Sequence, residues 1–277
     1  MIRFLTLFCL ISSCAISESP GKLFDHVVIV VLENVDYSDA IKNPYLKSLI
    51  PTGALLSNFN AIMHPSYPNY LAMTAGNTFG FTADHQGSVD AFSIADLLES
   101  RGLSWKNYAE GYPGNCFLGS THDRYARKHV PFLSYKSVQD SPARCARVVS
   151  GEQFQSDWES GQLPHYAFYT PDMDNDGHDT GLLFAGDWLQ KFLTPLLHDS
   201  ERMKRTLIVV TFDESGPLSS NHQIFTLLLG PVIKSGVAVS TAYNHYSLLR
   251  TIEDNFGLGT LGREDRHAEA IQGVWTE

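Results

Sequence analysis

Two apolar runs rich in β-branched residues, each closed by acidic side chains, constrain the fold of this chain most strongly. They read "DHVVIVVLEN" over residues 25–34 and "RTLIVVTFDES" over residues 205–215. Valine and isoleucine favour strands, and a near-continuous apolar run is typical of a strand buried on both faces of a parallel sheet. Further strands are expected at 165–171 and 223–231, and helix-like apolar spacing occurs at 92–102, 182–197 and 246–256. This alternation predicts a three-layer α/β/α sandwich with a mostly parallel central sheet.

Acidic and amide side chains follow three of the expected strands. Glu33 and Asn34 end the first run, Asp213 and Glu214 end the later run, and an aspartate-rich loop follows residue 170. In open α/β sheets, ligands bind beyond the carboxyl ends of the strands. Like charges gathered at one edge repel one another unless a cation lies between them. The three strand ends therefore favour a metal site over scattered surface acids.

The aspartate-rich loop, "TPDMDNDGHDTG" over residues 170–181, opens like the calcium loop of an EF-hand. Its aspartates at alternate positions and Gly177 fit that opening, but position twelve is Leu183, where a bidentate glutamate is required. The segment before the loop is aromatic and strand-like rather than helical. An EF-hand is therefore excluded, while a non-catalytic calcium-binding surface module stays an alternative function.

The amino terminus has the pattern of a targeting segment. Residues 1–17 place one arginine before a short apolar stretch and small residues, which predicts a signal peptide followed by a single domain over 18–277. The apolar stretch is too short to span a bilayer. The mature protein is therefore expected to be secreted or periplasmic. "ISSC", which ends at Cys14, also resembles a lipobox, so a lipoprotein anchored through Cys14 is the alternative.

The cysteine count fits an exported protein. Of four cysteines, Cys9 and Cys14 fall in the signal, which leaves Cys116 and Cys145 in the mature chain. In an oxidising compartment this pair is expected to form one disulfide, and two buried thiols are the alternative.

The formal net charge of the chain is −10 at pH 7. A broad basic footprint for nucleic acid is therefore missing. Phosphate esters remain suitable ligands, because a metal ion or local hydrogen-bond donors can reverse the field inside a site.

A serine lies in "HPSYPNYLAMTAG", residues 64–76. Ser66 is expected at the amino-terminal end of a helix, where free backbone N–H groups favour a phosphate and help to ionise a metal-bound serine. The alternative is that Ser66 only caps this helix.

These segments together resemble the alkaline phosphatase superfamily, and within it the phosphoesterase family that includes secreted acid phosphatases and bacterial phospholipases C. The resemblance covers nearly all of the mature chain and implies an alkaline phosphatase-like fold. It is carried by "VVLEN", "HPSYPNYLAMTAG", "NDGHD", "TFDES", "NHQIFTLLLGPVIKSG" and "YNHYSLLRTIEDNFGL".

The resemblance implies a role for each matching residue. Ser66 is implied as the nucleophile that is phosphorylated during turnover. The implied metal ligands are Glu33, Asn34, Asp213, Glu214 and the Ser66 hydroxyl. The implied catalytic histidines are His178, His222 and His245, and the implied substrate contacts are His129, Asn69 and Asp176. Asp174 and Asp176, four and two residues before His178, both fit a position that faces the site.

The ligand set departs from that of two-zinc members of the superfamily. Those members have Asp-His where this chain has Asp213-Glu214, and an aspartate where it has Glu33-Asn34. Oxygen ligands suit Mg²⁺, Mn²⁺ or Ca²⁺ better than zinc. One divalent ion is therefore expected near Ser66, with histidines handling the phosphate opposite it.

The function expected from this set is a metal-dependent phosphomonoesterase, an acid phosphatase that acts through a phosphoserine. Phosphoinositides or other small phosphate monoesters are the implied substrates. A phosphodiesterase of the phospholipase C type is the alternative that uses the same machinery.

Overall fold

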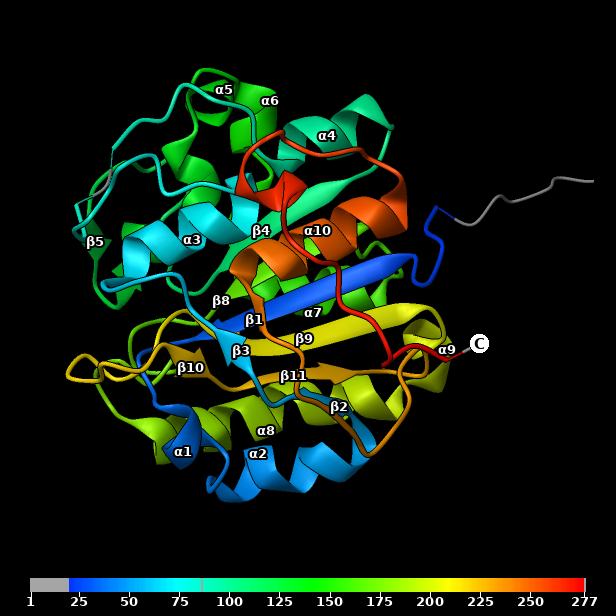
Figure 1. Ribbon diagram of the computed structural model, residues 1–277. Helices are drawn as coiled ribbons and strands as arrows, with labels where there is room; N and C mark the ends of the chain where they lie inside the picture. The colour runs from blue at the N-terminus through cyan, green and yellow to red at the C-terminus, as the bar shows by residue number, and fades with distance from the viewer. Residues whose placement is uncertain (1–19, 86, 277) are drawn as a thin grey trace, which may run out of the picture.

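The computed structural model describes residues 20–85 and 87–276. The signal peptide and Cys14 lie outside the described residues. The central element is an eight-stranded sheet, drawn through the middle of Figure 1. In sheet order its strands are β12 (Val237–Val239), β2 (Ala54–Leu56), β11 (Thr226–Leu229), β9 (Thr206–Phe212), β1 (His26–Leu32), β8 (Tyr166–Thr170), β4 (Trp105–Ala109) and β7 (Val148–Ser150).

Strand β1 lies between β9 and β8 and is parallel to both, which confirms the two buried strands predicted at 25–34 and 205–215. Val28 is in register with Ile208 on one side and with Ala167 on the other. These side chains are fully buried, and a buried valine or isoleucine contributes about 1.5–3 kcal/mol. The parallel part of the sheet continues from β8 through β4 to β7.

The strand expected at 223–231 is two short elements, because its halves pair with different sheets. β11 runs antiparallel to β9 and β2 within the central sheet. β10 (Gln223–Ile224) instead pairs with β3 (Phe59–Asn60), which also pairs with β13 (Tyr243–Asn244). A third sheet joins β5 (Thr121–His122) to β6 (Tyr125–Ala126).

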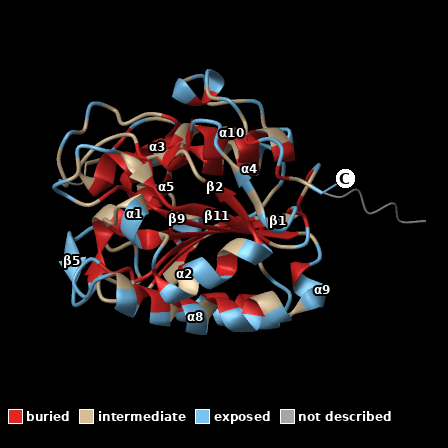
Figure 2. Cartoon of the chain, turned by 60° about the horizontal axis from the view of Figure 1, so that its bottom comes forward, coloured by how far each residue is buried: buried red, intermediate tan, exposed pale blue. Residues whose placement is uncertain are grey.

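Helices cover both faces of the sheet, as predicted for a three-layer sandwich (Figures 1 and 2). On one face lie α3 (Ser66–Ala75), α10 (His245–Phe256) and α4 (Ile94–Ser100); on the other lie α2 (Pro44–Leu49) and α8 (Leu182–His198). The apolar spacing at 92–102, 182–197 and 246–256 therefore identified α4, α8 and α10. The remaining helices are α1 (Tyr37–Ala40), α5 (Lys136–Gln139), α6 (Pro142–Cys145), α7 (Glu152–Glu159) and α9 (Ser200–Met203), with short 3₁₀ turns at Ile50–Thr52, Arg127–His129, Pro131–Ser134 and Glu264–Arg266.

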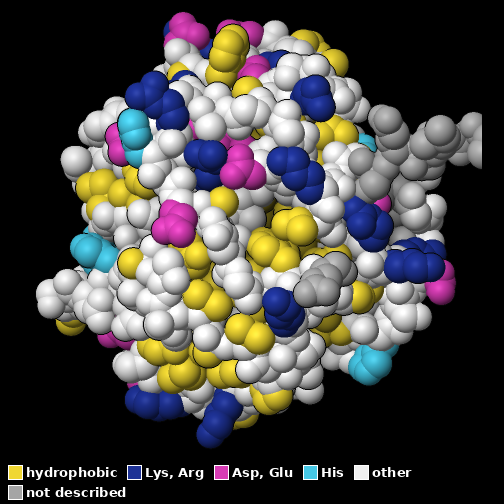
Figure 3. Space-filling view, turned by 45° about the vertical axis from the view of Figure 1, so that its right-hand side comes forward, with side chains coloured by type: hydrophobic (Ala, Val, Ile, Leu, Met, Phe, Trp, Pro, Cys, Tyr) yellow, Lys and Arg dark blue, Asp and Glu magenta, His cyan; other side chains and the backbone are white. Residues whose placement is uncertain are grey.

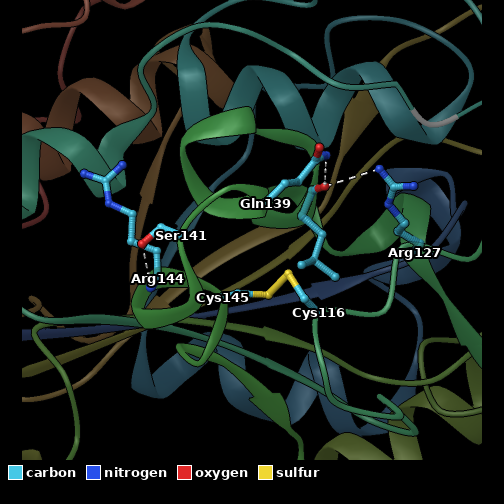
Figure 4. The surroundings of a disulfide bond; sticks show 7 residues. Cys116, Arg127, Gln139, Ser141, Arg144 and Cys145 are labelled. Atoms are coloured by element: carbon cyan, nitrogen blue, oxygen red, sulfur yellow. Dashed lines mark hydrogen bonds between the residues drawn. A yellow bond between two sulfur atoms is a disulfide. The ribbon is translucent and has the colours of Figure 1, made fainter.

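The predicted disulfide joins Cys116, in the loop after β4, to Cys145 at the end of α6 (Figure 4). The same region is tied by Arg127 and Gln139, whose side chains both donate to the carbonyl of Leu133, at 3.2 and 2.7 Å. A covalent link and buried hydrogen bonds thus hold the segment that leads into His129.

The surface charge and the helices concern two expectations from the sequence: no basic footprint for nucleic acid, and no membrane-spanning segment. On the face drawn in Figure 3, lysines and arginines are scattered among neutral and apolar side chains rather than gathered into one field. Across residues 20–85 and 87–276, none of the helices has both the length and the apolar character needed to cross a bilayer.

Candidate active site

Three strand ends meet at the centre of the carboxyl edge of the sheet. Glu33 follows β1, Asp213 follows β9, and the loop that follows β8 carries Asp176. Backbone bonds fix these ends to one another: the Glu33 N–H donates to the Asp176 carbonyl at 3.1 Å, and the Asp213 N–H donates to the Leu32 carbonyl at 3.0 Å. Parallel pairing of β1 with both neighbours therefore gathers the three acids that the sequence placed on separate strands.

Ser66 is the first residue of α3, as expected, and Pro65 is the residue that precedes the helix. The N–H of Tyr67, next in the helix, is accepted by Asp84 Oδ1 at 3.0 Å. Ser66 is therefore not the N-cap. Its hydroxyl instead faces the strand ends, 3.0 Å from Glu33 Oε2 and 3.1 Å from Glu214 Oε1.

The surroundings of the Ser66 hydroxyl are rich in acceptors and poor in donors. Asn34 Oδ1 is a third acceptor, 3.4 Å from Oγ, yet a hydroxyl carries only one proton. Asp213 Oδ1 accepts the Asn34 N–H at 3.2 Å, while Asp213 Oδ2 is buried without a hydrogen-bond partner. Converging oxygens with an orphaned carboxylate atom are the donor set that a hard divalent cation prefers. The residues therefore fit the predicted ion.

The acids in this cluster oppose one another electrostatically. Burial, followed by the charges of Glu33 and Glu214, raises the pKa of Asp213 well above its usual range. Burial and the charge of Glu33 also raise the pKa of Glu214, against a hydrogen bond from His64. A cation among these carboxylates would offset both the burial cost and the repulsion.

A buried histidine lies on the opposite side of Glu33. His129 Nε2 is 3.2 Å from Glu33 Oε1, and its Nδ1 is 3.4 Å from Asp176 Oδ2. Burial opposes a charged imidazole, yet Glu33 and Asp176 raise the pKa of His129 to about 10. Burial alone would raise the pKa of Glu33, but the charge and hydrogen bond of His129 bring it down to about 2. Glu33, His129 and Asp176 form a buried group that could also bind a metal ion.

The structure distinguishes the two aspartates that precede His178. Asp176 is buried against His129, whereas Asp174 is partly exposed and pairs with Arg124 at 3.2 Å. His178 is exposed, its ring centroid lies 6.4 Å from that of His129, and its N–H donates to Asp176 Oδ1 at 2.8 Å. Asp176, with His178 beside it, is therefore the part of the loop that faces the site.

The other predicted histidines occupy two different settings. The His222 ring lies 5.0 Å from that of His64, and His64 Nδ1 contacts Glu214 Oε2. His245 is fully buried, and its Nε2 bonds to the Asp213 carbonyl at 2.6 Å. Burial lowers the pKa of His245 to about 4, against that hydrogen bond, so it is a neutral ring behind Asp213. This bond places His245 beside a predicted metal ligand, and the catalytic role that the resemblance implied for it stays a prediction.

Asn69 holds the turn before Ser66. Its Oδ1 accepts the N–H groups of Ile62 and Met63, and its Nδ2 donates to the carbonyls of Met63 and Pro65. The side chain is fully buried, and these four bonds use its hydrogen-bonding capacity. This placement fits a positioning role and leaves no group for the substrate contact that the resemblance implied.

Two further residues belong to the site and were not predicted. Tyr70 donates from its hydroxyl to Glu33 Oε1 at 2.5 Å and stacks on His129, with ring centroids 5.2 Å apart. Lys128 pairs with Asp84 at 2.8 Å, and its charge lowers the pKa of Glu33. The position of Tyr70, four residues after Ser66, could have indicated that both share one helix face.

The fold is that of the alkaline phosphatase superfamily. A superfamily member from Vibrio parahaemolyticus superposes with a TM-score of 0.61, at 13% sequence identity, over 87% of this chain and 69% of that one. A phosphonate monoester hydrolase from Silicibacter pomeroyi gives a TM-score of 0.55 at 12% identity, over 84% of this chain and 73% of that one. Identities this low show the shared fold and nothing finer.

Within that fold, the chain belongs to the phosphoesterase family, whose model matches residues 33–259. It is 38% identical over 269 residues to an acid phosphatase of Aspergillus fumigatus, covering 93% of this chain and 60% of that protein. It is 34% identical to a phosphatidylinositol-3-phosphatase of Mycobacterium tuberculosis, covering 94% of this chain and 86% of that protein. The chain thus spans about 60% of the length of the Aspergillus relative.

Proposed function

We propose that this protein is an acid phosphatase that hydrolyses phosphate monoesters through a phosphoserine on Ser66. The observation that carries the proposal is the Ser66 hydroxyl at the start of α3, aimed at oxygens of Glu33, Asn34 and Glu214. A surface calcium module has no need of a buried nucleophile in this setting. The relatives named acid phosphatase and phosphatidylinositol-3-phosphatase support the same conclusion.

One divalent ion is proposed at the acceptor-rich cluster. Its ligands would be Glu33, Asn34, Asp213, Glu214 and the Ser66 oxygen, of which Asp213 supplies an unpartnered buried atom. Mg²⁺, Mn²⁺ or Ca²⁺ suits these oxygens. When bound, the ion would supply positive charge that favours the ionised serine and offsets a phosphoryl oxygen.

The chemistry of the first step follows from the groups around Ser66. Ser66 Oγ attacks phosphorus as the ester bond to the leaving oxygen breaks, and the leaving oxygen takes the bonding electron pair. Glu33 and Glu214 lie 3.0 and 3.1 Å from Oγ and are the candidate acceptors for the serine proton.

Histidines balance charge and supply a proton in this proposal. His129, held positive between Glu33 and Asp176, balances charge beside the phosphoryl group. His178 is the exposed histidine placed to protonate the leaving oxygen, with His222 as the second candidate. A histidine acid must carry its proton, which favours turnover at acidic pH. Water then hydrolyses the phosphoserine and restores Ser66.

Small phosphate monoesters, phosphoinositides among them, are the proposed substrates. The phosphatidylinositol-3-phosphatase relative supports this choice, since the alignment covers 86% of its length. A phosphodiester substrate is the competing choice. The rates on p-nitrophenyl phosphate and on its bis ester separate the two.

The proposal is tested with p-nitrophenyl phosphate across pH, before and after removal of metal. We expect an acidic optimum, loss of activity in EDTA with recovery on adding Mg²⁺, Mn²⁺ or Ca²⁺, and a fall of about 10³-fold or more in Ser66→Ala. Ser134→Ala, which removes another fully buried serine hydroxyl, controls for damage to the fold. Hydrolysis by Ser66→Ala at the wild-type rate would refute the serine mechanism.

A secreted or periplasmic location is also proposed, with lipid anchoring through Cys14 as the alternative. The Cys116–Cys145 disulfide supports an oxidising compartment. Fractionation of cells that express the full chain, followed by mass spectrometry of the mature amino terminus, tests the location. A Cys14→Ser variant distinguishes cleavage without a lipid from anchoring.

A further inference from the structure

The acidic loop, residues 171–181, must hold a defined shape because it carries Asp176 against His129. Within the loop, the Asp172 side chain accepts the N–H groups of Asp174 and Asn175, at 3.0 and 2.9 Å. The Asp172 carbonyl accepts the Asp176 N–H at 2.8 Å. These are local bonds, and they do not fix the loop to the sheet.

Glu110, directly after β4, supplies one of the links between the loop and the scaffold. Elsewhere the Met173 N–H donates to the Arg124 carbonyl at 3.0 Å, and the Arg124 side chain pairs with Asp174 and Asp179. Glu110 Oε2 accepts the backbone N–H of Asp172 at 3.0 Å and the side-chain amide of Asn175 at 2.7 Å. Its Oε1 accepts the hydroxyl of Tyr169 at 3.0 Å and the indole N–H of Trp188 at 3.2 Å. One oxygen therefore binds the loop, and the other binds strand β8 and helix α8.

The four donors occupy both oxygens of the Glu110 carboxylate. Two oxygens with two donors each leave no acceptor capacity directed at another ligand, so the acid is not a spare cation site. Burial raises the pKa of Glu110, and the bonds from Asn175 and Asp172 oppose that shift. Hydrogen bonds to a charged acceptor are the stronger kind, which suits a group that must hold a loop still.

The path from Glu110 to the reacting atoms is short. Asn175, which Glu110 binds, is the residue before Asp176 in the chain. Asp176 then makes two contacts with the site: its carbonyl accepts the Glu33 N–H at 3.1 Å, and its carboxylate lies 3.4 Å from His129 Nδ1. A shift of the loop would therefore move the partner of His129 and disturb the backbone at Glu33.

We propose that Glu110 is a positioning residue for catalysis, which fixes the acidic loop so that Asp176 keeps His129 oriented beside Ser66. The inference rests on the proposed phosphatase function. None of the described hydrogen bonds of Glu110 reaches Ser66 or the ligand cluster, so its effect on catalysis must pass through the groups it binds.

Two substitutions distinguish the bonds that Glu110 makes to the loop from those that it makes to β8 and α8. Glu110→Gln replaces one acceptor oxygen by an N–H₂ group that faces existing donors, whichever way the amide lies. Asn175→Ala removes one donor on the loop side and leaves the Tyr169 and Trp188 bonds intact. We expect kcat to fall about tenfold or more in Glu110→Gln and less in Asn175→Ala, with KM nearly unchanged.

A matched control is offered by Asp157, another buried carboxylate in the same half of the molecule. It accepts hydrogen bonds from Lys106 Nζ at 2.5 Å and from the Tyr108 hydroxyl at 2.7 Å, and none of its described bonds reaches the acidic loop. Asp157→Asn is expected to lower Tm while kcat and KM stay at wild-type values.

Hydrogen–deuterium exchange of the loop gives a readout that does not depend on turnover. Peptides that cover 171–181 should exchange about threefold faster or more in Glu110→Gln, and at the wild-type rate in Asp157→Asn. If Glu110→Gln lowers Tm but leaves kcat and loop exchange unchanged, Glu110 is structural only and the inference is wrong. If the wild type shows no Ser66-dependent hydrolysis, the proposed function fails separately, and loop exchange still decides whether Glu110 holds the loop.

Discussion

Two groups of buried and half-buried acids in this protein differ in whether arginine side chains balance their charge. Beside β4, Asp96 and Glu99 are each paired with arginine: Arg144 contacts Asp96 at 2.7 Å and Glu99 at 2.6 Å, and Arg147 contacts Glu99 at 2.9 Å. Around Ser66, Asp213 and Glu214 have no arginine or lysine partner within the described residues. Only histidine side chains and the Ser66 hydroxyl oppose the effect of burial on their pKa values. Acids balanced by arginine thus stabilise the scaffold, whereas the acids without an arginine or lysine partner at the strand ends form the proposed ligand site.

The largest effect is expected from a substitution of Asp213, which should lower activity and raise stability in the absence of metal. Asp213→Asn can keep the acceptor that receives the Asn34 N–H and place an N–H₂ donor where Oδ2 now lies among carboxylates. Activity should fall about 10²-fold or more, because a ligand is lost while like-charge repulsion is relieved. In EDTA, however, the variant should be more stable than wild type by about 1–3 kcal/mol.

The measurement is thermal unfolding of both proteins in EDTA and in Mg²⁺, Mn²⁺ or Ca²⁺, beside assays of activity. Metal should raise the Tm of the wild type more than that of Asp213→Asn, because the native site gains more from the ion. A variant that is less stable than wild type in EDTA would show that the cluster is already balanced without a cation.

Much of this arrangement could be predicted from sequence because the relevant signals are local. The β-branched runs identified β1 and β9, and the acids that follow them identified the edge where they meet. Ser66 was placed at a helix start by the residues that follow it. The side-chain partners were not predictable, because His129 reaches Glu33 and Asp176 across 96 and 47 positions of the chain. No local pattern encodes such contacts, and none shows that the His245 ring bonds to the Asp213 carbonyl.

Glu253, a buried acid in α10 outside the candidate site, should make the stability of the fold depend on pH. Both its carboxylate oxygens are buried. Burial, followed by the charge of Asp265, raises its pKa from 4.5 to about 9. The backbone N–H of Leu261 and the charge of Arg250 oppose the shift. The folded state therefore holds a proton that the unfolded chain releases above pH 4.5. This contribution to stability is full below pH 4.5 and is lost as pH rises towards 9.

Urea unfolding across pH tests this assignment. The wild type should lose up to about 1.4 kcal/mol of unfolding free energy per pH unit in that window from this group, whereas Glu253→Gln should lack this component. The variant should therefore be the more stable protein at pH 8. Parallel pH curves for the two proteins would mean that Glu253 ionises normally in the fold.

The smallest effect is expected where the acids are already balanced. Arg144→Ala leaves Asp96 and Glu99 with fewer partners, but these groups are partly exposed, so the loss of stability should be only about 1 kcal/mol. Activity should stay at the wild-type level, because the paired acids lie away from Ser66. Lys136→Ala is the matched control: its contact with Asp90, at 3.5 Å, is exposed and should contribute nothing measurable. A large loss of kcat in Arg144→Ala, with Tm retained, would contradict the division of the acids into scaffold and site.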